Sequence, residues 1–84
     1  MEPTPRSIVE FIDAKGANPF RAWITALRDA KGRNVIRTRV NRLIAGNFGD
    51  CGPVGGGVHE LVIDFGPGYR VYFGEDAQTV VLLG

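Results

Sequence analysis

Residues 58–74, VHELVIDFGPGYRVYFG, decide the fold, because two alternating segments flank the turn-forming run GPG at 66–68. Alternation of apolar and polar side chains around a short Gly/Pro turn predicts a β-hairpin with strands 58–65 and 69–74. A turn centred on Pro67 places one apolar set on a single side of the sheet. This set is His59, Leu61, Ile63, Phe65, Tyr69, Val71 and Phe73.

Arg70 is the only lysine or arginine within residues 43–84, and in this register it faces away from the apolar set, as does Tyr72. The same register places Asp64 directly opposite Arg70, with Glu60 nearby. An exposed cross-strand ion pair of this kind contributes only about 0.2–1 kcal/mol. Arg70 is therefore expected to be a weakly paired surface residue that remains available for another partner.

Two helices are predicted before this hairpin. Asn18 and Pro19 are typical of an N-cap and a first helical position. Gly32 interrupts the apolar pattern, and a second helix follows and ends near Gly46. The apolar stripes are Phe20, Trp23, Ile24 and Leu27 in the first helix and Ile36, Val40, Leu43 and Ile44 in the second. Together they predict a two-helix hairpin.

The remaining segments predict two further strands and a loop. Residues 6–13, RSIVEFID, are β-branched and aromatic, as is typical of a strand. Residues 46–57, GNFGDCGPVGGG, contain six glycines and predict a loop. Residues 79–84, TVVLLG, predict a last strand whose edge is uncovered and invites pairing with a partner or a second copy. The expected fold class is α+β: an N-terminal strand, a two-helix hairpin and a three-stranded antiparallel sheet.

The composition fits one small globular domain over residues 1–84, with 44% hydrophobic and 23% charged residues. No apolar run is long enough to cross a bilayer, and the start MEPTPRSIVEFID is unlike a signal peptide. Cys51 is the one cysteine, and the chain shows no His/Cys or carboxylate cluster at metal-ligand spacing. We therefore expect a cytoplasmic protein with no membrane segment, metal or cofactor.

The net charge of +1 conceals a basic segment between Arg28 and Arg42, in which Asp29 is the one acidic residue. Such a segment suits phosphates or an acidic protein surface, although a solvated helix face is the more common reason for it. The candidates for contacting a phosphate backbone, such as that of RNA, are Arg33, Arg37, Arg39 and Arg42.

The strings GNFGD, PVGGGVHEL and GPGYRVYF, at residues 46–50, 53–61 and 66–73, resemble the RelE/ParE superfamily of bacterial toxins, specifically the HigB-like addiction-module killer proteins. The resemblance runs from about Phe11 to Gly84. It implies a RelE-like fold and the toxin of a type II toxin–antitoxin system, which inhibits translation as a ribosome-associated mRNA endoribonuclease. It also implies an antitoxin partner, commonly of helix-turn-helix type.

The resemblance gives Arg70 the catalytic role of offsetting charge on the scissile phosphate, and places Tyr72 beside it to orient a base or assist proton transfer. A guanidinium suits this role because its fork matches phosphate oxygens and stays charged. Cleavage through the RNA's own 2′-hydroxyl needs no metal. His59, on the apolar side, is interpreted as a structural residue.

The chain departs from the family at Gly52, where a basic residue is usual, and at Val62, which is expected opposite Tyr72 and where an arginine is usual. It also lacks the family's C-terminal segment after Gly84. Loss of several phosphate-facing cations keeps a second interpretation open, in which the protein is catalytically weak and mainly binds its antitoxin. A third interpretation is a ParE-like gyrase inhibitor.

Overall fold

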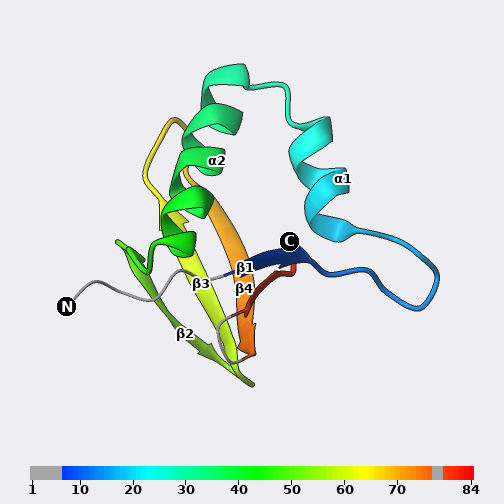
Figure 1. Cartoon of the computed structure of the whole chain (residues 1–84). Coiled ribbons are helices and arrows are strands. Elements are labelled where there is room, and N and C mark those ends of the chain that lie inside the picture. The colour runs from blue at the N-terminus through cyan, green and yellow to red at the C-terminus, as the bar shows by residue number, and fades with distance from the viewer. Residues whose placement is uncertain (1–6, 77–78) are drawn as a thin grey trace.

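The computed structural model describes residues 7–76 and 79–84, which form one mixed sheet with two helices against it (Figure 1). The sheet order is β1-β5-β4-β3-β2, in which β1 and β5 are parallel and the other neighbours antiparallel. The elements are β1 (Ser7–Glu10), α1 (Pro19–Ala26), α2 (Ala30–Ile44), β2 (Cys51–Gly55), β3 (Val58–Ile63), β4 (Tyr69–Asp76) and β5 (Thr79–Leu82).

The predicted arrangement of an N-terminal strand, a two-helix hairpin and a three-stranded antiparallel sheet is wrong. The described residues form a five-stranded mixed sheet, because β1 joins it beside β5 and an unpredicted strand, β2, adds the opposite edge. The helices also do not pack along each other as a hairpin, since a groove lies between α1 and α2 above β1. Each helix instead packs its apolar side onto the sheet.

Strand β2 lies inside the glycine-rich segment that was predicted to be a loop. Its residues pair with β3, with Cys51 opposite Leu61 and Gly52 opposite Glu60. An edge strand needs hydrogen bonds on one side only, so it tolerates Pro53 and glycine better than a central strand does. The glycines that act as turn residues follow, at 55–57, where all three have positive φ.

The helix starts follow the capping rules. Asn18 accepts a hydrogen bond from the Arg21 N–H at 2.9 Å, so the predicted N-cap of α1 is confirmed. The prediction that Gly32 separates the two helices is wrong. Gly32 lies inside α2, which is capped by Asp29. The break falls at residues 27–29, where Leu27 and Asp29 both have extended backbone.

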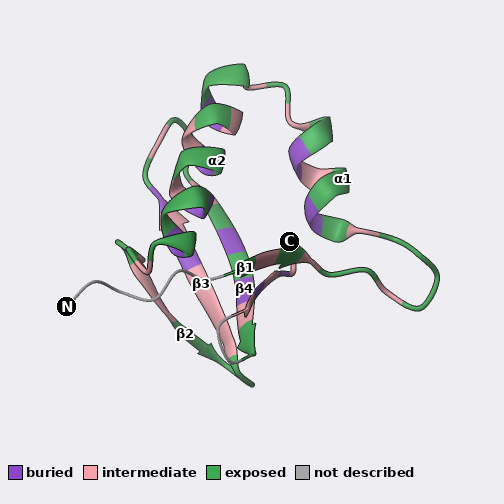
Figure 2. Ribbon diagram, in the orientation of Figure 1, coloured by how far each residue is buried: buried purple, intermediate pink, exposed green. Residues whose placement is uncertain are grey.

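The core lies between the helices and one face of the sheet (Figure 2). The predicted apolar side of the β3–β4 hairpin is confirmed, and His59 stacks on Phe73 with ring centroids 5.4 Å apart. The fully or nearly buried residues are Phe20, Ile24, Ile36, Val40, Leu43, Leu61, Ile63, Val71, Phe73, Val80 and Leu82.

The predicted register of that hairpin is wrong by one position on each strand. Ile63 pairs with Tyr69, which centres the turn on Gly66 rather than Pro67. Gly66 and Gly68 both adopt positive φ, at 59° and 88°, and allow the chain to reverse there. This shift keeps the predicted faces but changes which residues are opposite one another.

The prediction that the last strand, β5, has an uncovered edge is wrong. Strand β1 pairs with it from Ser7↔Thr79 to Glu10↔Leu82. The Phe11 N–H continues this pairing by donating to the Leu82 carbonyl at 2.8 Å. The predicted self-association through the last strand therefore loses its structural basis, since the edge is already occupied.

Candidate functional site

One face of the sheet has no described helix against it, and we call it the open face. Ile8 and Glu10 of β1 line the groove on the helix side, so Val9 between them points to the open face. The same alternation applies to the other strands, whose buried residues all face the helices. The open face comprises Val9, Val58, Glu60, Val62, Arg70, Tyr72, Val81 and Leu83.

Tyr72 is near the middle of the open face. Its backbone N–H donates to the Gly84 carbonyl, and its carbonyl accepts from the Leu83 N–H, both at 2.8 Å. On its other side it is directly opposite Glu60, which in turn is opposite Gly52. A row of side-chain positions therefore crosses the sheet in the order Leu83, Tyr72, Glu60 and Gly52.

Arg70 forms an ion pair with Glu60, whose Oε1 lies 2.9 Å from its Nη1. The Arg70 side chain is 64% exposed, whereas that of Glu60 is only 18% exposed. Glu60 Oε1 is buried and accepts no hydrogen bond from the described residues, so the contact with Nη1 is an ion pair without hydrogen-bond alignment. The guanidinium thus covers a carboxylate oxygen that still lacks a hydrogen-bond donor.

The predicted neighbours of Arg70 are corrected by the observed register. Val62, not Asp64, is directly opposite Arg70, and Asp64 is an exposed residue beyond the end of β3. Glu60, not Val62, is opposite Tyr72. The carboxylate that pairs with Arg70 is therefore diagonal to it, and it stands between Val58 and Val62 on the open side of β3.

Arg70 follows Tyr69, which is tied to the start of α2. The Tyr69 hydroxyl donates to Asp29 Oδ2 at 2.8 Å, while Asp29 Oδ1 accepts from the Gly32 N–H at 2.9 Å. The Gly32 bond and, second, the Tyr69 bond lower the pKa of the Asp29 carboxyl. The hydrogen bond to Asp29 also raises the pKa of Tyr69. This contact holds the beginning of β4 against the helix layer.

The four arginines predicted to hold RNA are not gathered around Arg70, because α2 lies on the other face of the sheet. Two of them, Arg33 and Arg39, are half-buried and bound to the backbone: the Arg33 guanidinium donates to the Leu27 carbonyl. Arg39 Nη1 donates to the Val62 carbonyl at 3.1 Å, so this side chain ties α2 to β3.

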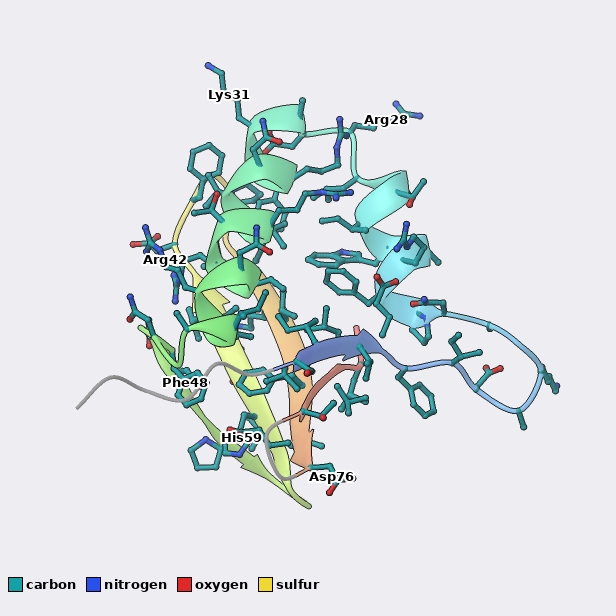
Figure 3. All side chains as sticks on the ribbon, viewed as in Figure 1. Arg28, Lys31, Arg42, Phe48, His59 and Asp76 are labelled. Atoms are coloured by element: carbon teal, nitrogen blue, oxygen red, sulfur yellow. The ribbon has the colours of Figure 1, made fainter. Side chains whose placement is uncertain are left out.

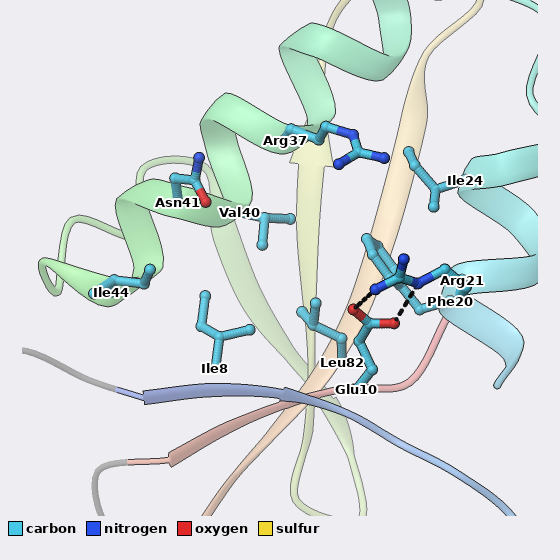
Figure 4. A pocket seen from close by; sticks show the side chains of 10 residues that line it. All are labelled: Ile8, Glu10, Phe20, Arg21, Ile24, Arg37, Val40, Asn41, Ile44 and Leu82. Atoms are coloured by element: carbon cyan, nitrogen blue, oxygen red, sulfur yellow. Dashed lines mark hydrogen bonds and ion pairs between the residues drawn. The ribbon is translucent and has the colours of Figure 1, made fainter.

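The other two, Arg37 and Arg42, are exposed. Arg37 points into the groove between the helices (Figure 4), whereas Arg42 projects from the outer side of α2 (Figure 3). Helical periodicity explains the spread, since residues 33, 37, 39 and 42 occupy different directions around one helix. The basic segment is therefore not one patch.

A groove with a volume of about 230 Å³ lies between α1, α2 and β1 on the helix side of the sheet (Figure 4). At its mouth Glu10 accepts hydrogen bonds from Arg21 Nη2 at 2.8 Å and from Arg21 Nε at 3.0 Å. The Arg21 bonds lower the pKa of the Glu10 carboxyl. The apolar residues that line the groove are Ile8, Phe20, Ile24, Val40, Ile44 and Leu82.

Within residues 7–76 and 79–84, no group of three or more His, Cys, Asp or Glu side chains is placed to hold a metal ion. No helix in this part of the chain is long and apolar enough to cross a membrane. Burial raises the pKa of the Cys51 thiol, which makes it a poor nucleophile.

Of the predicted site residues, the structure brings Arg70 and Tyr72 together on the open face and places the four helix arginines elsewhere. Sequence reasoning missed Glu60 as the direct partner of Arg70 and as the neighbour of Tyr72. Its alternation with Leu61 on the strand had indicated the correct face. Predicting the diagonal contact between Arg70 and Glu60 requires the register of β3 against β4, and that register depends on the turn between them.

The fold and the open face define a small protein with a five-stranded mixed sheet, two helices on one side and an arginine–glutamate pair on the other. A Haemophilus influenzae (strain ATCC 51907 / DSM 11121 / KW20 / Rd) protein, described as an uncharacterized protein, is 39% identical over 72 residues, which is 86% of this chain and 73% of that protein. The chain belongs to the same family as this protein. No family model and no solved structure matches the chain.

Proposed function

We propose that this protein is the toxin of a type II toxin–antitoxin system, acting as a metal-independent endoribonuclease on mRNA at the ribosome. The observation that carries the proposal is the Arg70 guanidinium, 64% exposed on the open face beside Tyr72. The RelE/ParE-like string GPGYRVYF supplies the expected chemistry for that arginine. The proposal includes a cytoplasmic location, where translating ribosomes are found, and an antitoxin partner of helix-turn-helix type.

Arg70 suits a phosphate because it is charged, accessible and fixed by a single partner. Nη1 contacts Glu60, while the rest of the guanidinium fork stays available for two phosphate oxygens. In RNA cleavage, negative charge builds on the phosphate in the transition state, and a positioned donor that offsets it contributes a factor of about 10²–10³ in rate. Arg70 is the candidate for this contribution.

Tyr72 suits a nucleobase because it is an aromatic residue, 37% exposed, next to that phosphate position. Phe11, which follows β1 and donates its N–H to the Leu82 carbonyl, is 41% exposed. Aromatic side chains on an open sheet face are platforms on which bases of single-stranded RNA stack, each worth about 1–3 kcal/mol. A single strand running from Phe11 toward Glu60 would cross Tyr72 and bring its backbone to Arg70.

The test is cleavage of a message on translating ribosomes by purified protein, with Arg70→Ala and Tyr72→Phe as variants. Lys15→Ala is the matched control, because it also removes one positive charge but from an exposed turn between β1 and α1. We expect cleavage by wild type and by the control, and a loss of about 10²-fold or more in Arg70→Ala. Equal cleavage by wild type and Arg70→Ala would remove Arg70 from the mechanism.

A second candidate is a catalytically weak protein that mainly binds its antitoxin, and the apolar character of the open face favours it. Val9 is 47% exposed, and Val81 and Leu83 are half-buried without a helix over them. Exposed apolar residues gathered on one face are typical of an interaction surface. Arg70 is also already paired with a carboxylate, which reduces its attraction for phosphate.

The two candidates differ in what Val81→Asp and Arg70→Ala do. If binding is the main role, neither wild type nor Arg70→Ala cleaves, and Val81→Asp abolishes co-purification with a co-expressed helix-turn-helix antitoxin. If the protein is a nuclease, wild type cleaves and Arg70→Ala does not. In either case, Lys15→Ala should behave like wild type in the cleavage assay and in the co-purification assay.

A further inference from the structure

We propose that Glu60 is the general base of this site, the group that removes the proton from the attacking 2′-hydroxyl of the RNA; the inference rests on the proposed function. The sequence placed Glu60 near Arg70 only as a weak ion-pair neighbour. Three observations on the open face identify it: its contact with Arg70, the unfilled hydrogen-bonding capacity of its Oε1, and the free space next to it.

The contact with Arg70 places base and phosphate donor at the right separation. Oε1 lies 2.9 Å from Nη1, so a phosphate held by the remainder of the guanidinium is adjacent to the carboxylate. The 2′-hydroxyl of the preceding ribose lies next to that phosphate in any RNA chain. A carboxylate one contact away from the arginine is therefore within reach of the proton to be removed.

The unfilled capacity of Oε1 is unusual for a carboxylate on a sheet surface. Surface carboxylates normally accept hydrogen bonds from water or side chains, whereas this oxygen is buried and accepts none from the described residues. Arg70 is the group in ion-pair contact with it, and phosphate competes for the same guanidinium. A small movement of the guanidinium toward a phosphate would uncover Oε1 beside that phosphate, where a ribose hydroxyl can donate to it.

Free space lies on the other side of Glu60. Gly52 is directly opposite it on β2, and a Cβ added there would meet nothing within 4 Å. Along β3 its neighbours on the open face are Val58 and Val62, which offer no competing donor. A ribose can thus sit over Gly52 with its 2′-hydroxyl toward Glu60, while the base lies toward Tyr72.

The reaction is then balanced as a transesterification. Glu60 accepts the 2′-hydroxyl proton, the 2′-oxygen forms a bond to phosphorus, and the bond from phosphorus to the 5′-oxygen breaks. The leaving 5′-oxygen takes a proton from water on the open face, and Glu60 returns its proton to solvent. The products are a 2′,3′-cyclic phosphate and a 5′-hydroxyl, with no oxidant, reductant or metal consumed.

The test compares wild type, Glu60→Gln and Asp64→Asn for the rate of message cleavage on ribosomes between pH 5 and pH 9. Asp64→Asn is the matched control: it removes the same charge, but from an exposed residue outside the site. We expect Glu60→Gln to lose a factor of about 10²–10⁴ in rate, with the control unchanged. Chemical mapping should find 2′,3′-cyclic ends in wild type.

Four outcomes are decisive. A Glu60→Gln rate equal to or higher than wild type overturns the base role and makes Glu60 a neutralising partner of Arg70. Absence of cleavage by wild type overturns the proposed function together with this inference, so the two failures are distinguished. If Glu60→Gln does not fold, Glu60→Asp keeps the charge but withdraws the carboxylate by one methylene. Loss of rate with retained RNA affinity in that variant supports the base, and an unchanged rate overturns it.

Discussion

The Tyr69 hydroxyl donates a 2.8 Å hydrogen bond to Asp29, which caps α2 and lies far away in the sequence. This bond fixes the residue before Arg70 to the helix layer, so the helices and the site-bearing strand form one unit. Its loss in Tyr69→Phe should lower the unfolding temperature at neutral pH. Tyr72→Phe is the control, since its hydroxyl has no hydrogen-bond partner among the described residues.

The pH dependence of that destabilisation follows from the two pKa shifts. The folded-state pKa of Asp29 is lowered from 3.8, so its stabilising contribution is present above 3.8 and is lost as the pH falls through the lower value. The folded-state pKa of Tyr69 is raised from 10.0, so its contribution is present below 10.0 and is lost as the pH rises through the higher value. In urea titrations, the difference in unfolding free energy between wild type and Tyr69→Phe should therefore be constant between these two pH values. It should decrease at lower and at higher pH. A constant difference down to pH 2 would contradict the role of Asp29.

Replacing Gly32 by alanine should destabilise the protein, although alanine is favoured over glycine in helices by about 1 kcal/mol. A Cβ at this position would lie 2.6 Å from Asp29 Oδ2 and 3.0 Å from Tyr69 Cε2, so both partners of the capping contact must move. Chemical denaturation measures whether Gly32→Ala lowers or raises the free energy of unfolding. The control is Asn34→Ala at an exposed position of the same helix, where we expect a gain of a few tenths of a kcal/mol. Increased stability of Gly32→Ala would show that the close approach is not restrictive.

Arg39 and Arg42 should separate stability from RNA binding. Arg39 Nη1 donates to the Val62 carbonyl, so Arg39→Ala should cost roughly 1–2 kcal/mol of unfolding free energy. Arg42 is exposed, and Arg42→Ala should change stability by no more than about 0.5 kcal/mol. If Arg42 contacts the RNA backbone, Arg42→Ala should instead reduce the salt dependence of ribosome or RNA binding. Equal stability of the two variants would contradict the structural role of Arg39.

Restoring a cation at Val62 should increase affinity for single-stranded RNA. Val62 is directly opposite Arg70, so Val62→Arg adds a second guanidinium to the open face. One additional phosphate contact should steepen the slope of log affinity against log salt by about 0.7. Like charges opposite each other should also cost about 0.2–1 kcal/mol in stability. Fluorescence anisotropy with a labelled oligonucleotide measures the slope. Val54→Arg, which places the same charge on the exposed edge strand, is the control.

Much of the sheet was predictable because it depends on local alternation. The faces of β3 and β4 follow from Leu61, Ile63, Val71 and Phe73, and these residues are buried as expected. The register was not predictable, because GPG contains two glycines that both reverse the chain, and the turn centre moved from Pro67 to Gly66. This change of register places Val62, instead of Asp64, opposite Arg70.

Other errors arose where tertiary pairing overrides local propensity. Strand β2 is rich in glycine and forms only because β3 offers it an edge, and β1 pairs with β5 although both helices and three other strands lie between them in the sequence. Gly32 lowers helix propensity, yet it is retained inside α2 by the contact with Asp29 and Tyr69. The spread of the four arginines follows from helix geometry, whereas their backbone partners, such as the Leu27 carbonyl, depend on packing.

The parallel pairing of Ser7 with Thr79 also constrains how the chain folds during synthesis. Strand β1 leaves the ribosome before β5, which is its neighbour in the sheet, so the nascent chain must keep Val9 and Phe11 without a sheet partner until β5 emerges. Such distant pairing slows folding and delays completion of the sheet. A newly made copy would therefore acquire its finished open face only once β5 has emerged, which gives a second protein time to meet it first.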